Sequence, residues 1–387
     1  MKRVLFLPLF QMESGHHRTA DALIEAFHKQ DPDIQCTKVD FLSYTNQTLE
    51  KVISQLYLNW ITKWPSAYSW MYTSFFQKDK SFMHSLYETL FVEKMEQLLE
   101  EEQPDLILCT HSFSSLLIDK LRSYGIETAP VVNVYTDFFM NGVWGKEHVD
   151  MHIVPTSDMK QTLIEGGVDS DSIKVSGILT NDTFKKRKPT KKDAKLHVLV
   201  GGGSLGLGDS LQSLVTKKGS SKIDYTILCG HNKELLDHVQ ALKSPNIKGM
   251  SYIAEAEQMN HLYNWADVLI TKPGGITMGE AIKKMLPIFV HSVLPGQEEK
   301  NMKYLEEEGL VHRLNPNTPI DRQVIAVLKD ESAQFLMKKS RHQFVKNIDV
   351  SSCSELAGLL TETYLQEHPD EHIRFIDDVF SKLYQTL

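Results

Sequence analysis

The stretch that decides the fold is DVLITKPGGITMGE, residues 267–280, in which a strand-like run passes through paired glycines into a helical pattern. Such a junction is typical of a parallel α/β sheet. Gly274 and Gly275 allow a ligand to approach the backbone closely, and the N–H groups that open the helix, including those of Ile276 and Thr277, lack acceptors within it. An anion such as phosphate can therefore accept hydrogen bonds there.

Two carboxylates and an amide accompany this junction. Glu280 lies one helical turn further along, where it can accept hydrogen bonds from ribose hydroxyls. Gln297 and Glu298, in PGQE, residues 295–298, follow a second strand-like run at 287–291 and can read sugar hydroxyls. Together the two blocks indicate a nucleotide-sugar pocket. The alternative is an ordinary tight turn with Glu280 as a solvated acid.

Size and composition set broad limits. The 387 residues suit two domains with a cleft between them, and 42 basic against 50 acidic side chains give no overall attraction to nucleic acid. Four scattered cysteines predict buried thiols in a reducing cytosol. The opening run MKRVLFLPLF, residues 1–10, is short and contains Pro8, which predicts a first strand rather than a signal peptide. No apolar stretch is long enough to cross a bilayer, so any membrane contact is expected to be peripheral.

Strand-like and helical patterns alternate along most of the chain, which predicts an α/β fold with two Rossmann-like, doubly wound domains facing a central cleft. A basic, nearly apolar-free stretch at 185–195 carries seven basic side chains and predicts a solvated linker. The predicted organisation is an acceptor- and membrane-binding domain at 1–184, the linker at 185–195, a nucleotide-sugar domain at 196–350 and C-terminal helices at 351–387. Those last helices are expected to pack back on the first domain.

Candidate catalytic residues follow the strands of the first domain. His16 lies at the start of a helix after the first strand, where the helix dipole favours the neutral imidazole and suits it as a general base. Asp137 follows the strand at 131–135 and can orient or deprotonate an acceptor hydroxyl. The alternatives are that His16 caps the helix or contacts a phosphate, and that Asp137 only forms a turn. Ser112 is expected to cap the helix that begins near it.

The second domain opens with GGGSLGLG, residues 201–208, after its first strand. Its backbone can cradle a diphosphate near Gly203, with Ser204 donating a hydroxyl, although the pattern matches neither a dinucleotide fingerprint nor a P-loop. Gly230 follows the next strand and brings another backbone loop to the same edge. Asp169-Ser-Asp171 is expected to be a solvated turn, and we expect no metal site and no cofactor.

Residues 51–82 interleave aromatic side chains with lysines, a pattern that favours a lipid headgroup interface. The alternative is that some of these rings are core and the rest a protein contact. The residues expected at an acceptor or membrane surface are Tyr57, Trp60, Trp64, Trp70, Phe75 and Phe76.

These blocks resemble the bacterial processive diacylglycerol glucosyltransferases and plant monogalactosyldiacylglycerol synthases, relatives of the lipid II glycosyltransferase in glycosyltransferase family 28. The resemblance covers nearly the whole chain and is carried by Gly15-His16 with Ala20, Leu56-Tyr57-Leu58, QPDLI at 103–107, VYTDF at 134–138 with Trp144, VSGI at 175–178, Cys229-Gly230, ITKPGGIT at 270–277, and PGQE at 295–298 with Asn301.

The resemblance implies a GT-B fold and a metal-independent transfer with inversion at the anomeric carbon. UDP-sugar would bind the C-terminal domain: Gly275 to Thr277 and Ser204 at the diphosphate, Glu280 at the ribose, Gln297 and Glu298 at the hexose, and the backbone near Met259 at the uracil. His16 would be the base. Two loops depart from the family pattern, at 11–14 and 177–181, and both are expected to line the cleft, so the acceptor can differ from diacylglycerol.

Three functions fit these observations. The first is an enzyme that transfers a hexose from UDP-sugar to a diacylglycerol-type lipid, in the cytoplasm at the inner face of the cell membrane. The second is a soluble transferase for a small or polyprenyl-linked acceptor, or a UDP-sugar epimerase of the same fold. The third is a non-catalytic UDP-sugar sensor.

Overall fold

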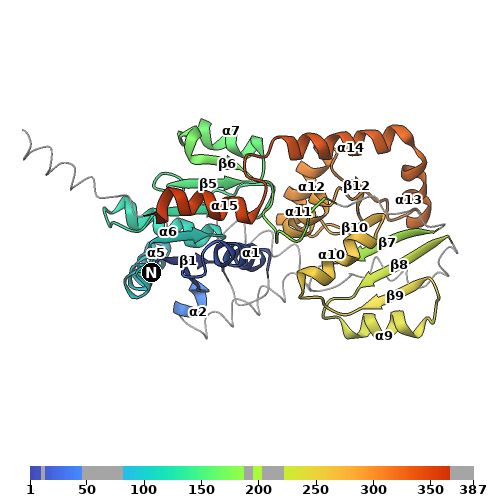
Figure 1. Ribbon diagram of the computed structural model, residues 1–387, viewed down its shortest axis with the longest axis horizontal. Coiled ribbons are helices and arrows are strands. Elements are labelled where there is room, and N and C mark those ends of the chain that lie inside the picture. Colours follow the sequence, from blue (N-terminus) through green and yellow to red (C-terminus); the bar gives the residue numbers. More distant parts are fainter. Residues whose placement is uncertain (10–13, 46–81, 187–194, 203–221, 367–387) are drawn as a thin grey trace, which may run out of the picture.

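Two parallel six-stranded sheets organise the chain (Figure 1). The computed structural model describes residues 1–9, 14–45, 82–186, 195–202 and 222–366. The first sheet has the order β2-β1-β3-β4-β5-β6 and the second β12-β11-β10-β7-β8-β9. In each sheet the order reverses once, between β1 and β3 and between β7 and β10, and ligands of doubly wound sheets bind beyond the strand ends at such points.

The first sheet and its helices occupy residues 3–175. The strands are β1 (Arg3–Leu7), β2 (Gln35–Lys38), β3 (Leu106–Cys109), β4 (Val131–Val134), β5 (Met151–Val154) and β6 (Ile173–Val175). The helices are α1 (Gly15–Gln30), α2 (Phe41–Thr45), α5 (Phe82–Glu102), α6 (Ser112–Ser123) and α7 (Ser157–Glu165), with a 3-10 turn at Ser170–Ser172.

The second sheet and the helices around it follow from residue 196. The strands are β7 (Leu196–Gly201), β8 (Ile223–Leu228), β9 (Ile247–Met250), β10 (Val268–Thr271), β11 (Ile288–Val290) and β12 (His312–Arg313). The helices are α9 (Lys233–Ala241), α10 (Ala256–Trp265), α11 (Gly275–Lys283), α12 (Gln297–Glu307), α13 (Ile320–Lys329), α14 (Glu331–Lys346) and α15 (Cys353–Leu360), which ends in a π turn at Thr361–Leu365.

Each sheet is buried on both faces, as the near-continuous apolar strands predict. Strand β1 illustrates the arrangement, because Val4 and Phe6 pack in the cluster with α1 while Leu5 and Leu7 pack in the cluster on the other face. The predicted strands are present within one to a few residues of their predicted ends. Strands β2 and β12 were not predicted, because β2 is partly exposed along its length and β12 has two residues.

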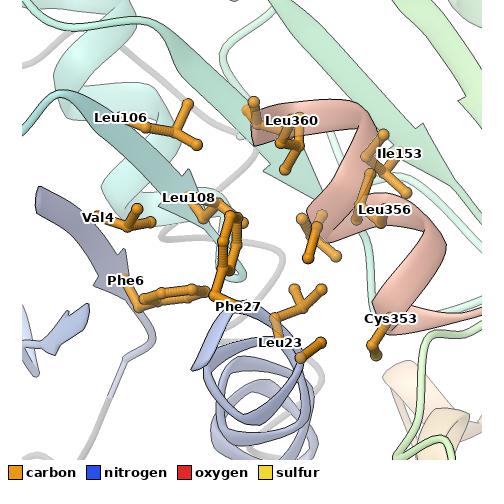
Figure 2. Packing of buried hydrophobic residues seen from close by; sticks show 14 of the residues in the cluster. Val4, Phe6, Leu23, Phe27, Leu106, Leu108, Ile153, Cys353, Leu356 and Leu360 are labelled. Atoms are coloured by element: carbon orange, nitrogen blue, oxygen red, sulfur yellow. The ribbon is translucent and has the colours of Figure 1, made fainter. Parts of the chain in front are cut away.

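Helix α15 packs on the first sheet although it follows the whole second sheet in sequence. Cys353, Leu356 and Leu360 lie beside Leu23 and Phe27 of α1 (Figure 2). The chain thus has two halves: the first half is the first sheet with its helices and α15, and the second half is the second sheet with the helices from α9 to α14. The chain crosses between the two halves a second time near residue 350. The exact domain boundaries given above stay a prediction.

Candidate active site

The site lies where the strand ends of the two halves meet. From the first half come the segments after β1, β3 and β4, and from the second come the segments after β10 and β11. Helices α11 and α12 of the second half lie next to the first half (Figure 1).

Glycines permit close contact between the halves. A Cβ atom on Gly275 would lie 2.0 Å from the Thr136 carbonyl oxygen, and one on Gly279, a turn later, would lie 2.8 Å from Ile178 Cβ. A Cβ on Gly15 of α1 would lie 2.9 Å from Ile276 Cγ1. The start of α11 therefore lies against the segments that carry His16 and Asp137, and at Gly275 a larger residue would collide with the Thr136 backbone.

His16 is oriented by two oxygen atoms of the first half. Its Nδ1 lies 2.7 Å from the Thr110 carbonyl oxygen and 2.9 Å from Thr136 Oγ1. A carbonyl oxygen can only accept, so Nδ1 carries the proton. In the neutral ring Nε2 is then the proton acceptor, as a general base requires. Burial lowers the pKa of His16, although the nearby Asp137 charge raises it, and the neutral form is favoured.

His111 is a second neutral imidazole, with its ring centroid 4.7 Å from that of His16. It is the N-cap of α6, and its Nδ1 accepts from the Phe113 N–H at 3.0 Å. The helix cap is therefore His111 and not Ser112, which is the first helical residue. Because Nδ1 accepts, the proton is on Nε2, the opposite tautomer to that of His16. Burial lowers the pKa of His111 well below its ordinary value, and the His16 charge adds to this.

Asp137 is held across the cleft by Asn301 of α12. Asn301 is 1% exposed. Its Nδ2 donates to Asp137 Oδ1 at 2.8 Å and to the Pro273 carbonyl oxygen at 3.1 Å. Its Oδ1 accepts from the Phe138 N–H at 2.8 Å. Burial raises the pKa of Asp137, and the His16 charge and the Asn301 hydrogen bond lower it. One amide thus joins the Asp137 carboxylate to the segment that leads into α11.

Helix α11 presents its N-terminal backbone beside this group. The first intrahelical bond runs from the Met278 N–H to the Gly274 carbonyl oxygen at 3.0 Å, so the Gly275, Ile276 and Thr277 N–H groups precede it. Gly274 is the N-cap and supplies no side-chain cap. Partial positive charge at this end suits an anionic group.

Glu280 and Met259 line a cavity of about 160 Å³ beside α11, together with Arg18, Thr180 and Asn181. Glu280 is 4% exposed and its Oε2 accepts from the Tyr263 hydroxyl at 2.7 Å. Burial raises the pKa of Glu280, whereas the Tyr263 hydrogen bond and the Arg18 charge lower it. The cavity is therefore polar on one side and gathers residues from both halves.

Contacts of Arg18, which lines this cavity, join α1 to the loops after β8 and β9. Arg18 Nη2 donates to the Tyr252 hydroxyl at 2.9 Å, and the Tyr252 and His231 rings are stacked with centroids 4.3 Å apart. Gly230 precedes His231 with a φ of 58°, in the left-handed region that glycine adopts without strain. The second half thus meets α1 here as well.

Gln297 and Glu298 form the first turn of α12. Glu298 Oε2 accepts from the Leu294 N–H at 2.7 Å, which shapes the loop after β11. Burial raises the pKa of Glu298, and this hydrogen bond and the Lys272 charge lower it. Asn301 lies one turn later on α12, so the same helix carries the predicted hexose contacts and the bridge to Asp137.

Several predicted residues lie outside the described part of the chain. They are Gly203, Ser204, Tyr57, Trp60, Trp64, Trp70, Phe75 and Phe76. Within the described ranges, no three His, Cys, Asp or Glu side chains are grouped as a metal site would require. None of the described helices combines the length and apolar character needed to cross a membrane.

Comparison with known proteins identifies the family. A family model described as monogalactosyldiacylglycerol (MGDG) synthase matches residues 16–179. The glycosyltransferase YkoN of Bacillus subtilis (strain 168), itself uncharacterized, is 38% identical over 320 residues, which cover 80% of this chain and 84% of YkoN. The processive diacylglycerol beta-glucosyltransferase of the same organism is 26% identical over 372 residues, covering 92% of this chain and 93% of the relative.

The chain belongs to the monogalactosyldiacylglycerol synthase and processive diacylglycerol glucosyltransferase family. The predicted GT-B fold is confirmed, because the crystal structure of Acinetobacter baumannii MurG superposes with a TM-score of 0.58 at 14% identity, covering 94% of this chain and all of MurG. The protein is accordingly a hexosyltransferase of family 28.

The structure adds residues to the site of this glycosyltransferase that the sequence did not single out. Thr110 and Thr136 orient His16; Thr110 directly follows β3 and Thr136 comes two residues after the end of β4, and both are buried at the strand ends, where such sites lie. Arg18 lies two residues after His16 in the same helix. Asn301 was noted only as part of the family resemblance, and its contacts depend on how the two halves meet.

Proposed function

We propose that this glycosyltransferase moves a hexose from a UDP-sugar to the hydroxyl of a diacylglycerol-type lipid, with inversion and without a metal ion. Support for the acceptor comes from the relative named processive diacylglycerol beta-glucosyltransferase. The single observation that carries the mechanism is the contact of Gly275 with Thr136, because it brings the start of α11 beside His16 and Asp137.

The proposed reaction is a single displacement. The acceptor hydroxyl gives its proton to His16 Nε2, and its oxygen attacks the anomeric carbon from the side opposite the diphosphate. The bond from that carbon to the diphosphate oxygen breaks, and UDP leaves with the electron pair. The N–H groups of Gly275, Ile276 and Thr277 would stabilise the developing negative charge, as preorganised donors do at other oxyanions. Asp137, from the same half of the chain, would stabilise the charged imidazole.

We propose that residues of the second half bind the UDP-sugar. Glu280 has one oxygen occupied by Tyr263 and the other available for ribose hydroxyls, and Met259 lines the same cavity near the expected uracil position. Gln297 and Glu298 are proposed to contact the hexose from the first turn of α12. Gly230 would approach the nucleotide from β8, and Gly203 and Ser204 would complete the diphosphate site.

The decisive experiment incubates the protein with labelled UDP-glucose or UDP-galactose and vesicles that contain diacylglycerol, followed by mass spectrometry of the lipids. A labelled glycolipid is expected, with a β linkage from the α-linked donor, at an undiminished rate in excess chelator. Retention of configuration or loss of activity in chelator would contradict inversion or metal independence respectively. UDP-hexose turnover on a water-soluble or polyprenyl-linked acceptor alone would favour the alternative acceptors.

Membrane action is tested separately. We propose that the protein works at the inner, cytoplasmic face of the cell membrane through the aromatic segment at 51–82. The purified protein is expected to float with vesicles, and a variant with Trp60, Trp64 and Trp70 changed to serine is expected to remain at the bottom of the gradient. Equal flotation of both proteins would rule out this segment as the contact.

A further inference from the structure

A second cavity lies between α13 and α14, away from the cleft. Its volume is about 320 Å³, and Pro287, Leu328, Glu331, Gln334, Lys338 and Arg341 are among its lining residues. Pro287 directly precedes β11, whereas the loops of the candidate active site follow the strand ends. The cavity is therefore at the opposite edge of the second sheet.

Arg341 is the unusual residue of this cavity. It is 4% exposed, and its Nε and Nη1 are buried without a hydrogen-bond partner among the residues that the structure describes. Burial lowers the pKa of Arg341 to about 10, a value at which the guanidinium still carries its charge at neutral pH. A buried charge without a partner is costly, so the native protein must supply one.

The other polar residues restrict what this partner can be. Lys338 precedes Arg341 by three residues, so both cations lie on one side of α14. Glu331 and Gln334 line the cavity toward the start of the helix, and the Gln334 amide nitrogen donates to the Leu328 carbonyl, which leaves its side-chain oxygen as an acceptor. The cavity thus offers two cations at one end and acceptors for hydroxyl groups at the other.

We propose that this cavity is a binding site for a small hydroxylated phosphate, such as a polyol phosphate or sugar phosphate. Arginine pairs with phosphate through two parallel N–H bonds, and Lys338 adds a second positive charge. The hydroxyls would donate to Glu331 and Gln334, with Pro287 and Leu328 as apolar walls. Its volume is close to the lower limit of about 300 Å³ for small-molecule sites.

Isothermal titration calorimetry with glycerol 3-phosphate tests the site on the full-length protein. One molecule is expected to bind per chain, and an excess of UDP is expected not to displace it. Arg341→Met should weaken binding at least about tenfold, since a hydrogen-bonded pair of charges is lost. Lys339→Met is the matched control: Lys339 is an exposed cation of α14 that does not line the cavity, and its loss should leave the affinity unchanged.

Two further ligands test whether both the phosphate and the hydroxyl groups are needed. Glycerol should give no binding, and inorganic phosphate should bind more weakly than glycerol 3-phosphate. Absence of binding to the unaltered protein, equal binding to the Arg341→Met variant, or displacement by UDP would each overturn the proposal. If Arg341→Met does not fold, Lys338→Gln at the exposed rim decides, because the proposal requires it to weaken binding. The measurement involves neither donor nor acceptor lipid, so its failure would leave the proposed glycosyl transfer untouched.

Discussion

His16 and His111 are neighbouring imidazoles that the backbone holds in opposite tautomers. The Thr110 carbonyl accepts from His16 Nδ1, and the Phe113 N–H donates to His111 Nδ1. Their rings are close enough that two positive charges would repel strongly in this buried position. The arrangement therefore keeps His16 Nε2 free of a proton at neutral pH and ready to accept one.

The first prediction follows from this residue pair. His16→Ala should lower kcat/KM by about 10² to 10⁴, the range of general base catalysis. Because burial lowers the pKa of His16, the rate of the unaltered enzyme should hold down to a pH below 6.5 and fall at lower pH. A pH profile of kcat/KM measures this. His17→Ala, which removes the adjacent imidazole, should retain most activity at neutral pH, and comparable losses in both variants would contradict the role of His16.

The second prediction concerns Asn301 as a positioning residue. Asn301→Ala should lower kcat at least about tenfold, because it leaves the Asp137 carboxylate and the Phe138 N–H without their partner. Its effect should not add to that of Asp137→Asn, since both act on one hydrogen-bonded pair. A double-mutant cycle on kcat measures the coupling. Additive effects in the cycle would show that Asn301 acts independently of Asp137.

At the scale of elements, α11 illustrates what sequence can and cannot reveal. The strand predicted at 267–271 and found at Val268–Thr271, the Gly-Gly turn and the helix after it were predicted from local pattern alone. The same pattern could not show that Gly275 and Gly279 face the first half rather than only a ligand, since that contact joins residues more than a hundred positions apart. The contacts of Asn301 and Thr136 could not be predicted for the same reason. The roles predicted for residues within 46–81 and 203–221 stay predictions, because these residues lie outside the described part of the chain.

The third prediction separates the two glycines of this turn. Gly275→Ala places a methyl group against the Thr136 carbonyl oxygen, an atom of the backbone that cannot turn aside, so the halves should not close. We expect a loss of at least about tenfold in kcat/KM, consistent with misplacement of catalytic groups. Nothing lies within 4 Å of a Cβ on Gly274, so Gly274→Ala should leave thermal stability unchanged and raise the KM for the donor if the diphosphate approaches there.

The controls for this pair are structural. Small-angle scattering with donor present should show an expanded Gly275→Ala protein beside a compact Gly274→Ala protein. Equal compactness of the two variants would contradict the closing role given to Gly275.

At the scale of the molecule, acid stability depends on buried neutral histidines. Burial lowers the pKa of His152, which is 0% exposed, to about 4. The unfolded chain takes up its proton near pH 6.5, so unfolding binds protons between the two values. The stabilising contribution is present above pH 6.5 and is lost as the pH falls through this window. For His152 alone, the free energy of unfolding is lower by about 3 kcal/mol once the pH has fallen from above 6.5 to about 4.

The fourth prediction is therefore a change of slope. Denaturant unfolding between about pH 7 and about pH 4.5 should show a steep loss of stability in the unaltered protein, and His152→Asn should reduce that slope. The slope is compared rather than the absolute stability, because the substitution also removes the contact with the Tyr135 hydroxyl. Equal slopes in the two proteins would mean that His152 is not held neutral.

Helix α15 completes the core around α1, so the first half is assembled from two pieces of the chain that are distant in sequence. A fragment cut after the basic stretch would lack Leu356 and Leu360 and would leave Leu23 and Phe27 uncovered. The two halves, when produced separately, are thus expected to be insoluble unless α15 is added as a separate peptide or fused to the end of the fragment that was cut after the basic stretch. An exchange of the second half between relatives should therefore place junctions near residues 185 and 350 and transfer the intervening piece as an insertion.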